Sequence, residues 1–75
     1  MGRLPVVSGR KIIKALTKKN FSVVSQKGSH VRLKKIDAGR VFIVIVPMHP
    51  ELAKGTLKSI LRQANITLNE LLELL

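Results

Sequence analysis

The sequence contains no cysteine, no tryptophan and no tyrosine, and only four of its 75 residues are acidic. Without cysteine, disulfide frameworks and cysteine-based zinc sites are excluded. Two phenylalanines are the only large aromatic residues, so a stacking platform for unpaired bases is not expected. The longest apolar run, residues 41–46 (VFIVIV), is far too short to cross a membrane. Residues 1–7 lack the apolar segment of a signal peptide, and we therefore expect a cytoplasmic protein.

Positive charge, in contrast, is abundant and concentrated in the first half of the chain. Fourteen Lys and Arg stand against four Asp and Glu, which gives a formal net charge of +10. Residues 1–40 hold eleven of these cations and one acid, Asp37, a balance of 11 − 1 = +10, whereas three bases and three acids cancel in residues 41–75. This excess is larger than solubility requires and indicates a polyanionic partner such as a nucleic acid. With so few aromatic residues, the contacts should go to phosphates, sugars or the shape of a duplex.

Hydrophobic periodicity and turn residues predict alternating helical and extended segments. Ser8 is a favoured N-cap for the first helix, and Thr67 and Glu70 have the spacing of a capping box for the last. Asn20 and Asn65 suit the left-handed position that ends a helix. The expected elements are a helix over 9–19, strands over 21–26, 29–35 and 40–46, a helix over 52–64, and a short helix over 68–75.

These elements predict the α+β fold class, as a single domain over residues 1–75. The short connections between the strands favour an antiparallel meander with the second strand in the centre. Each main helix has one apolar face, so both should cover the same face of the sheet. Val31 and Leu33 are expected to point toward the helices, which leaves His30, Arg32 and Lys34 on the open face.

His30 is the strongest candidate for chemistry, because it lies just past the turn Lys27-Gly28 and has cations around it. Imidazole titrates near neutral pH, and neighbouring positive charge favours its neutral, proton-accepting form. Lys27, Arg32 and Lys34 are predicted to bind phosphate and stabilise charge in phosphoryl transfer. Gly28 gives the turn its backbone freedom and lets a substrate approach. The competing interpretation is a hairpin that carries an incidental surface histidine.

Two further features have alternative interpretations. His49, between Met48 and Pro50, is either the second acid or base of a two-histidine ribonuclease or a residue whose hydrogen bonds fix a loop. The third strand, residues 41–46, is apolar on both faces. One face belongs in the core, and the other is either shielded by a loop or the terminal helix, or binds a partner. Two histidines without cysteine make a poor metal site, and no metal or cofactor is predicted.

Several segments, with matching spacing over nearly the whole chain, resemble one known family. They are Ser8-Gly9 before the basic helix, Phe21, the turn Gln26-Lys27-Gly28-Ser29-His30, the run Val46-Pro47-Met48-His49, and residues 55–64 (GTLKSILRQA). Together they resemble the HicA family, the mRNA interferase toxins of type II toxin–antitoxin modules. Asn20 and Asn65 replace glycines common in that family, a mild departure because asparagine also tolerates the left-handed cap.

The resemblance implies a double-stranded-RNA-binding-domain-like α-β-β-β-α fold with a short C-terminal helix, RNA cleavage that depends on His30, and inhibition by a HicB-type antitoxin. Its support for His49 is weaker. The predicted function is therefore a metal-independent endoribonuclease toxin that cleaves mRNA. His30 is its general base, and the substrate-binding residues are Lys27, Gly28, Ser29, Arg32 and Lys34. Two alternatives remain: a non-catalytic RNA-binding module with the same basic surface, and an interaction domain whose third strand binds a protein.

Overall fold

The computed structural model describes residues 3–75, so the first two residues of the predicted domain and of the N-terminal segment lie outside the described residues. The elements are α1 (Gly9–Thr17), β1 (Ser22–Lys27), β2 (His30–Asp37), β3 (Arg40–Pro47), α2 (Lys54–Ala64) and α3 (Leu68–Leu74). The predicted α+β class and the order α-β-β-β-α with a C-terminal helix are confirmed.

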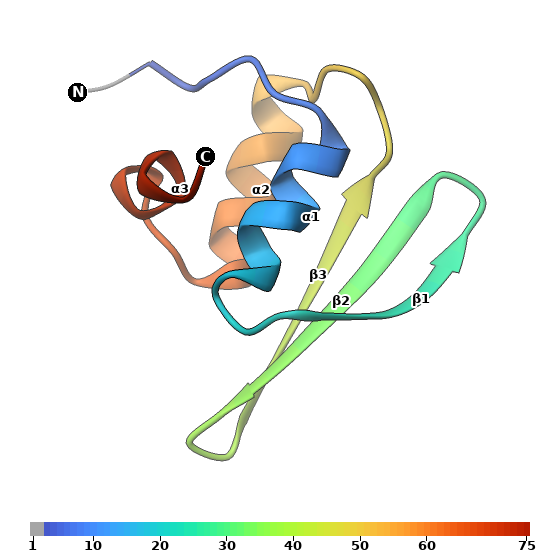
Figure 1. The fold of residues 1–75 in the computed structure, drawn as a ribbon, viewed down its shortest axis with the longest axis vertical. Coiled ribbons are helices and arrows are strands. Elements are labelled where there is room, and N and C mark those ends of the chain that lie inside the picture. Colours follow the sequence, from blue (N-terminus) through green and yellow to red (C-terminus); the bar gives the residue numbers. More distant parts are fainter. Residues whose placement is uncertain (1–2) are drawn as a thin grey trace.

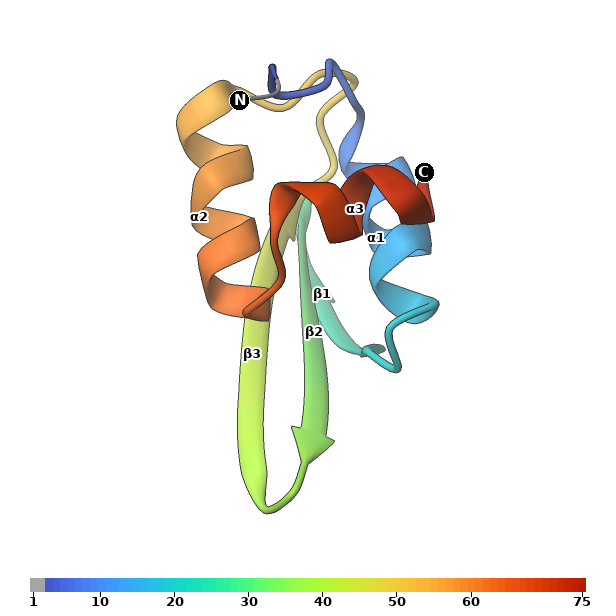
Figure 2. The ribbon, with the colours of Figure 1, turned by 90° about the vertical axis from the view of Figure 1, so that its left-hand side faces the viewer.

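The three strands form one antiparallel sheet in the order β1-β2-β3, which confirms β2 as the central strand. All three helices lie on one face of this sheet, and α3 lies across the outer side of α1 and α2 (Figures 1 and 2). The far end of the β2–β3 hairpin extends beyond the helices (Figure 2). One face of the sheet therefore packs into the core, and the other is open.

The alternation predicted for β2 is confirmed by burial. Val31 and Leu33 are buried against the helices, whereas His30 and Arg32 are exposed on the open face and Lys34 is half-buried. The helices complete the core with fully buried side chains such as Ile12, Leu16, Leu57, Ile60 and Leu71.

On β3 the structure decides which apolar face is covered. Val44 and Val46 are completely buried. Val41 and Ile45 point to the open face, where their exposed fractions are 56% and 38%. The interpretation that a loop or the terminal helix shields this second face is therefore wrong. Instead, α2 lies beside the β3 edge, where the main-chain N–H of Ile45 donates to Oε1 of Gln63 at 3.0 Å.

Two helix boundaries differ from the prediction, the end of α1 because of local hydrogen bonds and the start of α2 because of a tertiary contact. α1 ends at Thr17 rather than at residue 19, because the next amides donate three residues back, from Lys18 to Ala15 O at 3.1 Å and from Lys19 to Leu16 O at 2.9 Å. α2 begins at Lys54 rather than at residue 52. The side chain of Leu52 is instead buried, and its N–H donates to Val7 O at 2.9 Å.

The predicted helix caps are confirmed. Asn20 and Asn65 have positive φ angles of 70° and 56°. In α3 the Thr67 hydroxyl accepts from Glu70 N at 3.1 Å, while the Glu70 carboxylate accepts from Thr67 N at 2.9 Å. That main-chain hydrogen bond, together with the Lys19 ammonium 3.1 Å from the other carboxylate oxygen, lowers the pKa of Glu70.

The two hairpin turns follow from backbone sterics. Gly28, with φ of 60°, and Ser29 form a two-residue loop between β1 and β2, so β2 starts at His30 and not, as predicted, at residue 29. A positive φ at the first loop position is what a tight hairpin with the twist of its strands requires. Ala38 and Gly39 both have positive φ, 51° and 79°, in the second two-residue loop.

Candidate active site

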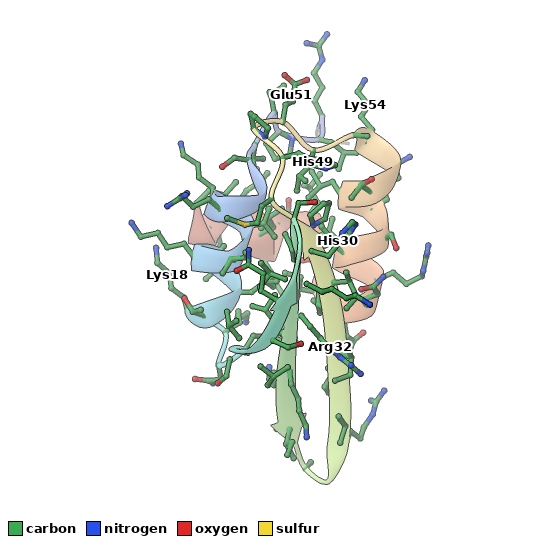
Figure 3. The ribbon with its side chains drawn as sticks, turned by 90° about the vertical axis from the view of Figure 1, so that its right-hand side faces the viewer. Lys18, His30, Arg32, His49, Glu51 and Lys54 are labelled. Atoms are coloured by element: carbon green, nitrogen blue, oxygen red, sulfur yellow. The ribbon has the colours of Figure 1, made fainter. Side chains whose placement is uncertain are left out.

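His30 is the first residue of β2 and lies on the open face of the sheet (Figure 3). In the strand register it is opposite Lys27 of β1 on one side and Pro47 of β3 on the other. Residues directly opposite one another in an antiparallel pair share a face, with Cβ atoms about 5 Å apart. The Lys27 and His30 side chains therefore start from neighbouring points on the open face.

The turn before His30 is fixed by hydrogen bonds on both sides. The Gln26 side-chain amide donates to Gly28 O at 3.1 Å. On the other side, Met48 N donates to Ser29 O at 2.6 Å, which ties the turn to the loop after β3. A Cβ built at Gly28 would meet nothing within 4 Å, so the space above the turn is open to a ligand.

Arg32 and Lys34 continue the same face of β2 away from His30. Arg32 is opposite Ser25 of β1 and Ile45 of β3 in the strand register. Figure 3 shows Arg32 farther along the sheet than His30, on the side toward the viewer. The structure thus brings Lys27, Gly28 and Ser29 next to His30, with Arg32 two residues along the same face. Lys34 shares this face but lies four residues from His30, about 13 Å along the strand, and is half-buried.

His49 is exposed in the loop after β3, at the same end of the sheet as His30 (Figure 3). Its main-chain carbonyl accepts from Gly9 N at 3.0 Å. Among residues 3–75, neither histidine ring takes part in a side-chain hydrogen bond. The main chain of His49, rather than its ring, therefore anchors this loop, and the ring is free for another role.

The comparisons with known proteins extend this description. A family model described as HicA toxin of bacterial toxin-antitoxin matches residues 9–66, more than three-quarters of the chain. The chain belongs to the HicA toxin family. A search of curated proteins finds no match. The matched segment of this HicA-family chain includes both histidines and the whole sheet, whereas α3 and the residues before α1 lie outside it.

Nothing in the sequence indicates that Arg10 lies near the candidate site of this HicA-family chain. A shallow hollow beside His49 is lined by Ser8, Arg10, Met48, His49 and Pro50. It exists because Gly9, at the start of α1, packs against the main chain of Pro47 at the end of β3. In the sequence, Arg10 is one of several cations in a basic helix. The packing of Gly9 against Pro47 places it at the end of the sheet that carries His30.

The structure also divides the positive charge that the sequence shows as one block. Lys35 lies over the Phe21 ring, 5.5 Å from its centroid, and Arg40 lies over Phe42 at 4.9 Å, both away from the open face. Lys19 is paired with Glu70. Apart from Arg3 in the segment before α1, two groups of exposed or half-buried cations from this block remain: Lys27, Arg32 and Lys34 on the sheet, and Arg10, Lys11, Lys14 and Lys18 on α1 and its C-cap.

Within residues 3–75, no three His, Asp or Glu side chains come close enough together to hold a metal ion. Across the same part of the chain, none of the helices has both the length and the apolar character needed to span a membrane.

Proposed function

We propose that this HicA-family chain is an endoribonuclease that cleaves mRNA without a bound metal ion, with His30 as its general base. The observation that carries the proposal is the position of His30, exposed at the end of the central strand, opposite Lys27 and on the same face as Arg32. A histidine base needs an open approach for its substrate and cations that bind the reacting phosphate, and this surface offers both.

In the proposed reaction, the neutral His30 ring accepts the proton of a ribose 2′-hydroxyl. The 2′-oxygen attacks the adjacent phosphorus, and the bond from phosphorus to the 5′-oxygen of the next nucleotide breaks. The products are a cyclic phosphate and a 5′-hydroxyl end. Lys27, Arg32 and Lys34 hold the phosphate and stabilise its developing charge, while Gly28 and Ser29 position the ring. His49, at the same end of the sheet, is the candidate for the acid that protonates the leaving oxygen.

This mechanism takes its nucleophile from the substrate, which gives a direct test. RNA with a single 2′-deoxy substitution at the scissile nucleotide should survive, whereas the matched all-ribose RNA should be cut at the same rate in EDTA as in magnesium. Product lengths on a denaturing gel, with detection of the cyclic phosphate, provide the measurement. Strict dependence on magnesium, or equal cutting of the deoxy-substituted RNA, contradicts the mechanism.

The same experiment separates the proposal from the non-catalytic alternative. A plain RNA-binding module would use the same cations, Lys27, Arg32 and Lys34, and would shift the RNA in a binding assay. It would leave both RNAs intact under all conditions, and replacement of His30 would change nothing on the gel.

We further propose that a HicB-type antitoxin inhibits the chain by covering the open face of the sheet. Val41, Ile43 and Ile45 follow one another on the open face of β3, beside the cations of β2. An acidic partner with apolar contacts complements this surface: opposite charge speeds association, and burial of the apolar side chains slows dissociation.

This arrangement predicts the result of co-expression. The chain expressed alone should arrest growth, and co-expression with the neighbouring reading frame should restore growth and yield a complex that co-purifies. In the isolated complex, Ile45→Asp should raise the dissociation rate about tenfold or more, because it places a charge in the apolar part of the interface. An interface elsewhere on the molecule would leave the dissociation rate of the Ile45→Asp complex unchanged.

A further inference from the structure

The first turn of α1 carries the wrong charge for a helix start. Ser8 caps the helix, and its Oγ accepts from Lys11 N at 3.1 Å. Lys11 is therefore the third helical residue, the position at which glutamate completes a capping box. α3 has that arrangement, with Thr67 and Glu70, whereas the first turn of α1 has no acid and contains Arg10 and Lys11. Cations near a helix N-terminus oppose the helix dipole, so these residues reduce the stability of α1.

Lys11 also begins a row of cations along the outer side of α1. Lys11, Lys14 and Lys18 are exposed, and their spacing of three and four residues places them on one helix face. The row covers about 10 Å along the helix axis. Within residues 3–75 the ion pair between Lys19 and Glu70 is the only salt bridge, so Lys11 and Lys14 have no acidic partner there. Lys18 donates to the carbonyl of Leu74 at 3.1 Å and also has no acidic partner.

The row begins at the end of the sheet that carries the candidate active site. Gly9 N donates to the carbonyl of His49, and the hollow beside His49 includes Arg10. From Arg10 the helix runs away from this end, with Lys18 near its far end and pointing to the side in Figure 3. Cations therefore extend from the open face around His30, past Arg10, to the outer side of α1.

We propose that the cations of α1 (Arg10, Lys11, Lys14 and Lys18) bind backbone phosphates of the RNA that flanks the cleavage site. This inference deepens the proposed ribonuclease function and rests on it. Lysine is depleted in protein–protein interfaces, whereas Lys and Arg make most phosphate contacts to nucleic acids. The cations in the first turn of α1 destabilise the helix, and binding of a polyanion gives them a function that offsets this cost. These phosphate contacts lengthen the RNA-binding site but do not distinguish one RNA sequence from another.

An acidic peptide is the other candidate occupant on this side of the molecule, and the test separates it from RNA. The lysine row itself lines one side of a groove of about 320 Å³, whose apolar walls come from the segment before α1 and from the C-terminus: Pro5, Val6, Val7, Leu74 and Leu75. A peptide seated there would depend on the apolar walls, whereas RNA on the row depends on charge. Val6, with 78% of its surface exposed, can be replaced by serine to change the wall without changing the charge.

The decisive variant is Lys11→Glu, made in the His30→Ala background so that RNA stays intact during binding measurements. It completes a capping box with Ser8, and Tm should rise by about 2–5 °C. Binding of a 30-nucleotide RNA should nevertheless weaken about tenfold at 0.1 M salt. The slope of log Kd against log salt should fall by about 0.7 for each phosphate that the variant no longer neutralises. Lys58→Glu, on the exposed side of α2, makes the same charge change and should leave the affinity within twofold.

A second readout uses the active chain and two substrates. Lys11→Glu with His30 intact should cut a dinucleotide RNA, whose single phosphate is the scissile one and which has no flanking phosphate for α1 to bind, as fast as the parent does. Its KM for the 30-nucleotide RNA should rise about tenfold, following the affinity. The proposal is overturned when Lys11→Glu and Lys58→Glu weaken binding equally, when neither does, or when Val6→Ser weakens it as much as Lys11→Glu. If the ribonuclease proposal itself fails, the parent protein cuts neither RNA. The RNA affinities of Lys11→Glu and Lys58→Glu can still be compared in that case.

Discussion

Replacing His30 by alanine should reduce RNA cleavage by about 100- to 10,000-fold, the usual effect of losing a general base. The variant should remain folded, because the side chain is exposed, lies outside the core and makes no hydrogen bond within the described residues. Truncation of such a residue changes the free energy of unfolding by about 0.5 kcal/mol or less. The measurements are the initial rate on a defined RNA and the Tm of each protein.

His49→Ala is the matched control, because it makes the same substitution at an exposed histidine at the same end of the sheet. We expect a smaller loss, since water can donate the proton to the leaving oxygen. His30→Ala should still bind RNA with an affinity within about threefold of the parent, because the phosphate contacts of Lys27 and Arg32 remain. Parental cleavage rates in a well-folded His30→Ala protein would remove His30 from the mechanism.

Of the four glycines among residues 3–75, Gly9 is the one whose replacement by alanine should destabilise the protein most. A Cβ on Gly9 would overlap the carbonyl oxygen of Pro47 and would lie only 3.2 Å from the Cα of Met48. Both neighbours are main-chain atoms that cannot rotate away, so α1 must shift from the end of β3 and strain the hydrogen bond from Gly9 N to His49 O. We expect a loss of about 3 kcal/mol in the free energy of unfolding, or roughly 15 °C in Tm.

Gly55→Ala provides the control for this prediction. Gly55 is also in the first turn of a helix, α2, but a Cβ there meets nothing within 4 Å. Alanine is favoured over glycine in helices, so this variant should be neutral or more stable by up to about 1 kcal/mol. Equal stabilities for Gly9→Ala and Gly55→Ala, measured by urea unfolding, would show that α1 and β3 are not close packed at this point.

Local chemistry made much of the fold predictable. The alternation of Val31 and Leu33 with His30 and Arg32 is a property of any extended strand, so the open face of β2 could be assigned without coordinates. The caps at Ser8 and Thr67 likewise involve atoms only three residues apart and follow from residue type and spacing. The position of His30 on an accessible surface beside cations was predictable for the same reason.

The start of α2 and the buried face of β3 could not be predicted from the sequence, because both depend on contacts with distant segments. Leu52 has the apolar character of a helix residue, but its burial and its hydrogen bond to Val7 keep it outside α2. Both faces of β3 are equally apolar in the sequence, and only the placement of α2 buries Val44 and exposes Ile45. Nothing in the local spacing distinguishes these outcomes, because each depends on which surface a remote helix covers.

The sequence by itself therefore determined the order of the elements, the direction of each side chain on β2, and the presence of a histidine among cations. Only the tertiary structure placed Arg10 beside His49, turned Lys35 and Arg40 onto aromatic rings, and separated the remaining cations between the sheet and α1. The physical reason is the range of the interactions. Backbone geometry and helix caps act between residues that are close in the sequence. The surface on which each cationic side chain lies depends on packing between distant segments, such as that of Gly9 against Pro47.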